Sequence, residues 1–202
     1  MSSLRITVFS DFSCPYSYVT ESSLRKLAVG ELEIVYRAFE LFPEPAPLEA
    51  PAVTDWEALS ELAAAEELDL VEPKFRPRTR KAHEASRLAR DRELEAAFRN
   101  EVFAAYWSEE RDIGRIDVLM DLAERVGLDG EDLKIALDID RFTGEVGRDL
   151  EVGQRLRIPG SPTIFLGTGA SARVVAGAFA SRQLRDIVHD TIRTLADEPH
   201  DG

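Results

Sequence analysis

The chain has a single cysteine among its 202 residues, Cys14, and this scarcity limits its chemistry. No intrachain disulfide can form, so a two-thiol redox cycle within one chain is excluded. Histidine is also scarce, and neither the three histidines nor Cys14 show the spacing of metal ligands. The sequence therefore predicts no metal site.

Positive charge is in deficit as well. The chain carries 38 acidic and 25 basic residues, which gives a net charge of −13. A field of that sign repels phosphate backbones, so we expect no nucleic-acid partner. The acidic residues are spread along amphipathic segments, as is typical of solvated helix faces.

Long apolar runs are missing too. No stretch approaches the roughly 18 consecutive apolar residues of a membrane helix, so we expect no membrane partner. Residues 1–5 lead directly into a strand pattern, without the basic segment and apolar core of a secretory signal. We therefore expect a soluble protein with a cytoplasmic localisation. With 44% hydrophobic residues, the chain can form one well-packed domain, or a domain with an insertion.

Strand patterns lie at both ends of the chain, and helical periodicity dominates between about Val53 and Arg157. Four prolines between residues 43 and 51 can continue neither a helix nor a central strand, so they mark the crossing into this helical region. Ser181 is expected to cap a last helix. The expected strands are 4–9, 32–39, 163–166 and 173–176, and the expected helices are 15–28, 79–90, 94–106, 116–126, 129–137, 142–152 and 181–195.

Cys14 stands between the first strand and the first helix. Pro15 at the first helical position supports a helix start there, because its missing N–H would have no helical partner. A thiol at a helix N-terminus meets the positive end of the helix dipole and free backbone N–H groups. We therefore expect a lowered pKa and a nucleophilic Cys14. The alternative is an inert thiol, since free cysteine is among the most often buried residues.

The element order βαβ, helical block, ββα, together with Cys14-Pro15-Tyr16-Ser17 and Gly160-Ser161-Pro162-Thr163, resembles the DsbA superfamily. Segments 37–41, 81–85 and 105–113 are similar to its FrnE-like branch. The resemblance runs from about Arg5 to Leu195. It implies an α/β fold, a thioredoxin fold with an inserted all-helical domain. The implied thioredoxin-fold domain is 1–51 and 158–197, the insertion is 52–157, and 198–202 is a flexible tail.

In that superfamily a cis-proline loop faces the nucleophilic cysteine. The resemblance therefore implies that Pro162 is a cis proline facing Cys14, with Ser161 before it, although most X–Pro bonds are trans. A cis bond would present the Ser161 backbone to an extended thiol peptide. Within the turn, Pro15 and Tyr16 are expected to contact substrate. For Tyr18, core packing is an equal alternative.

Ser17 departs from the superfamily pattern, because the dithiol members carry their second cysteine there. Residues 11–18 also look like the 2-hydroxychromene-2-carboxylate isomerases, glutathione-dependent relatives that carry serine in place of Cys14. A hydroxyl cannot resolve a mixed disulfide, so the second thiol must come from solution. We therefore expect no tightly bound cofactor, and glutathione or another small thiol as partner. Ser17 either donates a hydrogen bond to the thiolate or fills space.

Three functions fit these features. The first is a cytoplasmic, FrnE-like thiol-disulfide oxidoreductase in which Cys14 acts as a monothiol, on disulfide-containing or small-molecule substrates; peroxide sensing through a sulfenate is a variant of it. The second is a glutathione-dependent isomerase. The third is a thioredoxin-fold binding protein without catalysis. A homodimer is left open. The basic cluster at residues 76–81 either holds a carboxylate or forms a solvated, salt-bridged face.

Overall fold

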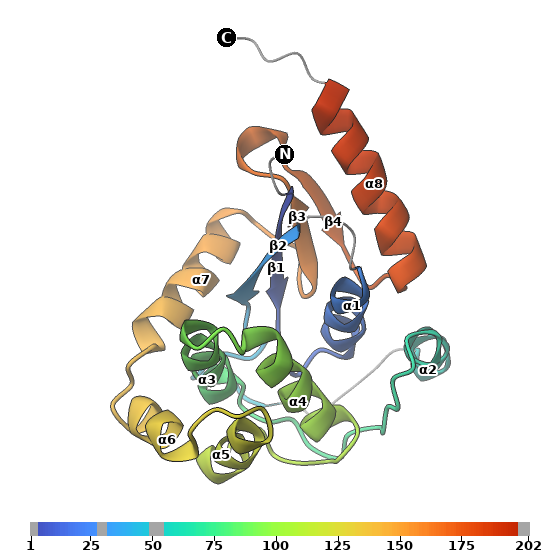
Figure 1. Ribbon diagram of the computed structural model, residues 1–202. Helices are drawn as coiled ribbons and strands as arrows, with labels where there is room; N and C mark the ends of the chain where they lie inside the picture. The colour runs from blue at the N-terminus through green and yellow to red at the C-terminus, as the bar shows by residue number, and fades with distance from the viewer. Residues whose placement is uncertain (1–3, 28–31, 49–54, 198–202) are drawn as a thin grey trace.

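Four strands form one mixed sheet in the order β2-β1-β3-β4 (Figure 1). The computed structural model describes residues 4–27, 32–48 and 55–197. The central strand β1 (Leu4–Ser10) pairs in parallel with β2 (Leu32–Ala38) and antiparallel with β3 (Thr163–Leu166). The hairpin partner β4 (Arg173–Ala176) completes the sheet, and the thioredoxin fold is confirmed.

Helices cover both faces of the sheet. The helices α1 (Pro15–Lys26) and α8 (Ser181–Asp197) lie on one face, and α7 (Thr143–Arg155) lies on the other (Figure 1). Alternate residues of β1 point to the α1 side, as the two-residue period of a strand requires. The core there consists of Ile6, Val8, Leu24, Leu27, Tyr36, Ile164, Leu166, Leu184 and Val188.

A second layer of helices lies at the carboxyl end of β1 (Figure 1). It comprises α2 (Trp56–Ala65), α3 (Arg80–Asp91), α4 (Glu95–Trp107), α5 (Ile116–Arg125) and α6 (Gly130–Asp138). The apolar faces of α3, α4, α5 and α6 form a separate core, which also takes in Phe12 and Tyr18 from either side of Cys14. The buried residues of α2, Leu59 and Ala63, form a small cluster with Val19 of α1. The segment that carries the thiol is therefore clamped between the two layers.

The expected elements agree with the structure to within a few residues, with one correction. Ser181 does not cap the last helix but is its first residue. Its backbone N–H donates to Glu66 Oε1 at 2.6 Å. A carboxylate from a distant part of the sequence therefore satisfies one of the free amides at this helix N-terminus. Ala28, the predicted boundary at residues 51 and 52, and the predicted tail at 198–202 lie outside the described residues.

Within the described ranges, no helix has both the length and the apolar character needed to cross a bilayer. Those ranges also hold no group of three or more histidine, cysteine, aspartate or glutamate side chains arranged to bind a metal ion.

Candidate active site

Cys14 is the N-cap residue of α1, as its position between strand and helix predicts. Its backbone N–H donates to the Asp11 carbonyl at 3.1 Å, and its own carbonyl accepts from the Ser17 amide at 3.1 Å. Pro15 occupies the first helical position, and the Cys14 side chain makes no capping hydrogen bond to the helix. The thiol is therefore available for other contacts.

The thiol faces the loop that precedes β3. Cys14 Sγ donates a hydrogen bond to the Ser161 carbonyl at 3.1 Å, and the Ser161–Pro162 peptide bond is cis. Ser17 Oγ lies 2.6 Å from Ser161 Oγ, which also accepts from the Asp11 backbone N–H at 2.8 Å. The structure thus brings together Cys14, Ser17, Ser161 and Pro162, which are far apart in sequence.

Cys14 is more deeply buried from solvent than its position at a helix start suggests. The residue is only 5% exposed. Burial raises the pKa of the Cys14 thiol, and the Asp11 carboxylate raises it further, while hydrogen bonds from Ser17 and Ser161 act in the opposite direction. The prediction of a lowered pKa is therefore wrong for this structure, because desolvation of the thiolate outweighs the nearby donors.

Asp11 is a site residue that sequence reasoning missed. Its buried carboxylate accepts hydrogen bonds from the Leu41 amide at 2.7 Å and from Ser13 Oγ at 3.0 Å, and His83 Nε2 lies 3.4 Å away. Burial pushes the pKa of Asp11 upward, but the contacts with His83 and Leu41 hold it below its ordinary value. An acidic residue directly after a buried strand and three positions before the cysteine was the available signal.

The aromatic residues of the turn have different surroundings. The Tyr18 ring stacks on Phe103 with centroids 5.2 Å apart and is buried, so core packing is its role. Tyr16 is half-buried and packs against a small cluster that includes Val19 and Leu59, between α1 and α2. Pro15 is buried. Substrate contact by Tyr16 and Pro15 stays a prediction.

The basic cluster at residues 76–81 forms a salt-bridged face, in agreement with one of the two sequence interpretations. Arg80 pairs with Glu40 at 2.6 Å, and Lys81 pairs with Asp140 at 2.6 Å. Arg78 donates to the carbonyls of residues 42 and 46. These pairs fix the chain around the active-site layer.

Sequence comparison gives a family match over most of the chain. Residues 5–189 match the DSBA-like thioredoxin domain family. The chain is also 32% identical over 145 residues to the uncharacterized protein YwbO of Bacillus subtilis (strain 168), which covers 67% of this chain and 72% of that protein.

Solved structures with the same fold come from several branches. The probable DsbA oxidoreductase SCO1869 from Streptomyces coelicolor has a TM-score of 0.80 at 24% identity, covering 94% of this chain and 90% of that one. A 2-hydroxychromene-2-carboxylate isomerase has a TM-score of 0.75 at 21% identity, covering 96% and 99%. The cytosolic disulfide reductase DsbM from Pseudomonas aeruginosa, in its structure with GSH, has a TM-score of 0.70 at 16% identity, covering 95% and 97%. At these identities the likeness shows the fold.

Proposed function

Because this chain belongs to the DSBA-like thioredoxin domain family, we propose that it is a thiol-disulfide oxidoreductase that works through one thiol, that of Cys14. The observation that carries the proposal is the contact of Cys14 Sγ with the Ser161 carbonyl, 3.1 Å away, in the loop of the cis proline. Ser17 supports the monothiol form, since a hydroxyl stands beside this loop in place of a second thiol.

The proposed cycle balances with a second thiol from solution. Cys14 loses its proton and its thiolate attacks one sulfur of a disulfide, while the other sulfur leaves with the electron pair and takes up a proton. A small thiol then loses its proton and attacks the mixed disulfide. This step releases reduced Cys14 and leaves the small thiol oxidised, as one half of a new disulfide. Ser17 does not take part in sulfur exchange.

The hydrogen bonds at the thiol suggest how substrate activates it. In the free protein the protonated thiol donates to the Ser161 carbonyl. A substrate peptide that pairs with this backbone would supply its own N–H to the carbonyl and so displace the thiol proton. The Ser17 and Ser161 hydroxyls would then donate hydrogen bonds to the thiolate, since hydrogen bonds from both side chains lower the pKa of Cys14.

Glutathione is the proposed small thiol, and the cytoplasm is the proposed location. Supporting observations are that the DsbM structure named above carries GSH and that DsbM is named as a cytosolic reductase. A cytoplasmic pool of reduced thiol would supply the resolving step that Ser17 cannot perform.

The second candidate is a glutathione-dependent isomerase, favoured by the fold shared with 2-hydroxychromene-2-carboxylate isomerase. In this case a bound small thiol carries the chemistry, and Cys14 helps to bind it. The Cys14→Ser variant separates the two candidates. It loses all disulfide exchange under the first, but keeps isomerase activity under the second.

Intact mass measured after incubation with oxidised glutathione tests the main proposal. We expect one glutathionyl adduct on the parent protein, removed by reduced glutathione, and none on Cys14→Ser. Ser17→Ala is the matched control and should still form the adduct. A parent protein that stays unmodified at every pH tested would refute the oxidoreductase proposal.

A further inference from the structure

The outer edge of β2 carries backbone groups that the sheet leaves open. In a parallel ladder, the N–H and C=O of every second residue point to the same side of the strand. The Tyr36 carbonyl and the Ala38 amide both bond to groups outside the sheet, so these residues face outward. The same two-residue period turns the N–H and C=O of Ile34 outward. In the described part of the chain, these two groups of Ile34 have no hydrogen-bond partner.

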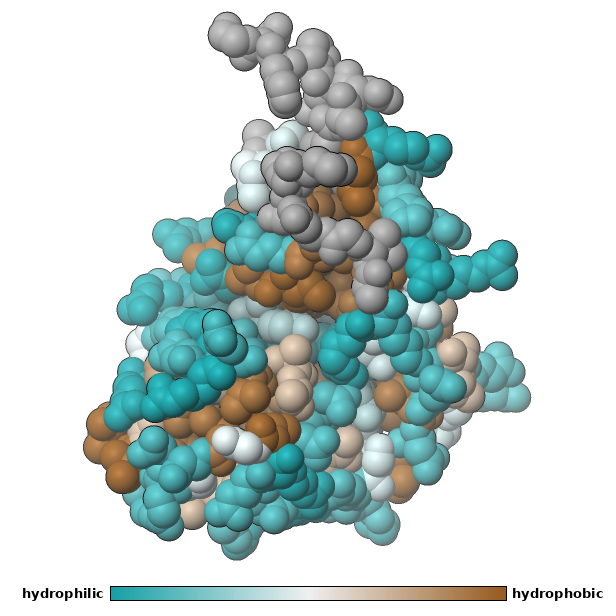
Figure 2. Space-filling view, in the orientation of Figure 1, coloured by the Kyte–Doolittle hydropathy of each residue, from teal (hydrophilic) through white to brown (hydrophobic). Residues whose placement is uncertain are grey.

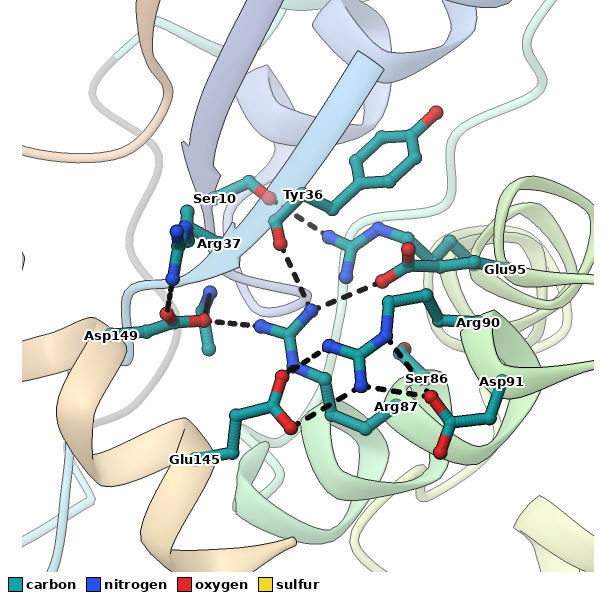
Figure 3. A network of polar contacts seen from close by, with 12 residues as sticks. Ser10, Tyr36, Arg37, Ser86, Arg87, Arg90, Asp91, Glu95, Glu145 and Asp149 are labelled. Atoms are coloured by element: carbon teal, nitrogen blue, oxygen red, sulfur yellow. Dashed lines mark hydrogen bonds and ion pairs between the residues drawn. The ribbon is translucent and has the colours of Figure 1, made fainter. Parts of the chain in front are cut away.

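The carboxyl half of the edge is already occupied by side chains. Arg87 donates to the Tyr36 carbonyl at 2.9 Å, and Asp149 accepts from the Ala38 amide at 3.1 Å (Figure 3). Arg87 also bonds to Asp149, so the pair offers one donor and one acceptor to the strand. These are the contacts that a neighbouring strand would make. The protein therefore closes one half of its edge and leaves the half around Ile34 open.

The open half borders a groove of about 530 Å³. The half-buried side chains of Leu32 and Ile34 contribute accessible apolar lining, whereas Leu24 and Leu27 are only 1% exposed. The start of α4 forms the opposite wall. Figure 2 shows hydrophobic side chains exposed across the middle of this face, where Figure 1 places the strands. Accessible apolar side chains beside an open edge are typical of an interaction site.

The groove carries charges of both signs. Besides Arg25 it is lined by Arg90, which pairs with Glu145, by Glu95, which pairs with Arg87, and by the exposed Glu93. The half-buried Arg25 side chain donates from Nη2 to the Asn100 side-chain oxygen at 2.5 Å. Its Nη1 is buried without a hydrogen-bond partner, and no carboxylate among the described residues lies within ion-pair distance of it. An occupant with a carboxylate would complement this cation.

We propose that the edge of β2 at Ile34 binds an extended peptide with aliphatic side chains and an acidic residue, as an added strand. The peptide would exchange main-chain hydrogen bonds with Ile34, bury alternate side chains against Leu32 and Ile34, and direct the acidic side chain to Arg25. This site is separate from Cys14 and does not depend on the proposed redox function.

Fluorescence anisotropy can test the proposal with a labelled, amidated heptapeptide in which valine alternates with threonine and one threonine is replaced by glutamate. In the Ile34→Pro variant the outward N–H is lost, a change that an edge strand tolerates. We expect it to weaken binding by about tenfold, the effect of losing a main-chain hydrogen bond at the centre of the contact. The Arg25→Gln variant should weaken binding of this peptide, but not of a copy with glutamine for glutamate.

The outcomes separate strand addition from other occupants. A copy of the peptide with N-methylated amides should not bind, because it cannot pair with an edge. Equal binding by this copy, or by Ile34→Pro, would contradict strand addition and indicate a pocket for apolar side chains. Failure of the parent protein to bind at millimolar peptide would refute the proposal. So would a parent dimer that Ile34→Pro converts to a monomer, since the edge would then serve a second copy. Far-UV circular dichroism and thermal unfolding, compared with those of the parent protein, establish that each variant is folded.

Discussion

His83 Nε2 lies 3.4 Å from Asp11 Oδ1, and both side chains are only 1% exposed. The two residues connect α3 of the helical layer to the end of β1, directly behind the cysteine turn. Since Asp11 also donates its backbone N–H to Ser161 Oγ, it contacts both the cis-proline loop and the helical layer. A negative charge is thereby held close to a thiol whose reaction requires a second negative charge.

Replacing Asp11 with asparagine should activate Cys14. The Asp11 carboxylate raises the pKa of the thiol, so the neutral amide should lower that pKa. The rate of iodoacetamide alkylation near neutral pH should rise accordingly. Asp117→Asn, which removes an exposed charge, is the control and should not change the rate. A slower or unchanged rate in Asp11→Asn would contradict the role assigned to this charge.

The pH dependence of the parent protein follows from the burial of Cys14. Desolvation raises the pKa of the thiol, so the reactive thiolate should form only above the ordinary thiol value of about 8.5. Alkylation rates measured from pH 6 to 11 should climb through that range. Because folding raises this pKa, the protonated thiol contributes to the free energy of unfolding at any pH below its unfolded-state pKa. That contribution is lost as the pH rises through the folded-state pKa. A rate plateau already reached at pH 7 would show that the helix start dominates over burial.

The buried pair of Arg99 and Glu21 should dominate the stability of the contact between the two layers. Arg99 donates twice to the Glu21 carboxylate, at 2.8 and 2.6 Å, and its guanidinium lies over the Phe12 and Tyr36 rings. Arg99→Met leaves a buried, unpaired carboxylate, which should cost about 3–5 kcal/mol in urea unfolding. Adding Glu21→Gln should recover part of this loss. Additive losses in the double variant would argue against coupling of the pair.

Two glycines of α7 make a matched test of packing on the sheet. An added Cβ at Gly153 would lie 2.8 Å from the Phe39 ring, whereas at Gly147 the nearest atom is 4.0 Å away. Gly153→Ala should therefore lower the free energy of unfolding by about 1–3 kcal/mol through overpacking. Gly147→Ala should raise it by about 0.5–1 kcal/mol, because alanine favours the helix. Equal effects in thermal unfolding would indicate that Phe39 moves away freely.

Much of the fold could be predicted from local patterns. The alternation in β1 and the helical periodicity of α8 come from residues close together in sequence, and the predicted bounds of both elements lie within two residues of the observed ones. The position of Cys14 at the start of α1 followed from its local context with Pro15. Its partner Ser161, 147 residues away, came from the family resemblance and not from the local pattern.

The electrostatic setting of the site could not be predicted in this way. The burial that raises the pKa of Cys14 depends on how the Ser161 loop and the helical layer close over the turn, which no local pattern encodes. His83 stands 72 positions from Asp11, within a helix whose periodicity predicts only a buried face. The side chains that close half of the β2 edge come from α3 and α7, so the open half became visible only in the assembled structure.

Changing Ser17 to cysteine should convert the single-thiol site into a dithiol site. Ser17 begins the hydrogen bonding of α1 by donating its amide to the Cys14 carbonyl, and its side chain shares the Ser161 contact with the thiol. Cysteine there would have its sulfur within reach of Cys14, with the spacing of redox-active pairs at helix starts. We expect loss of two protons on oxidation, and insulin reduction that the parent lacks. Ser17→Ala controls for loss of the hydroxyl and should show neither effect. If Ser17→Cys keeps two free thiols under oxidising conditions, the turn does not have the geometry of a dithiol oxidoreductase.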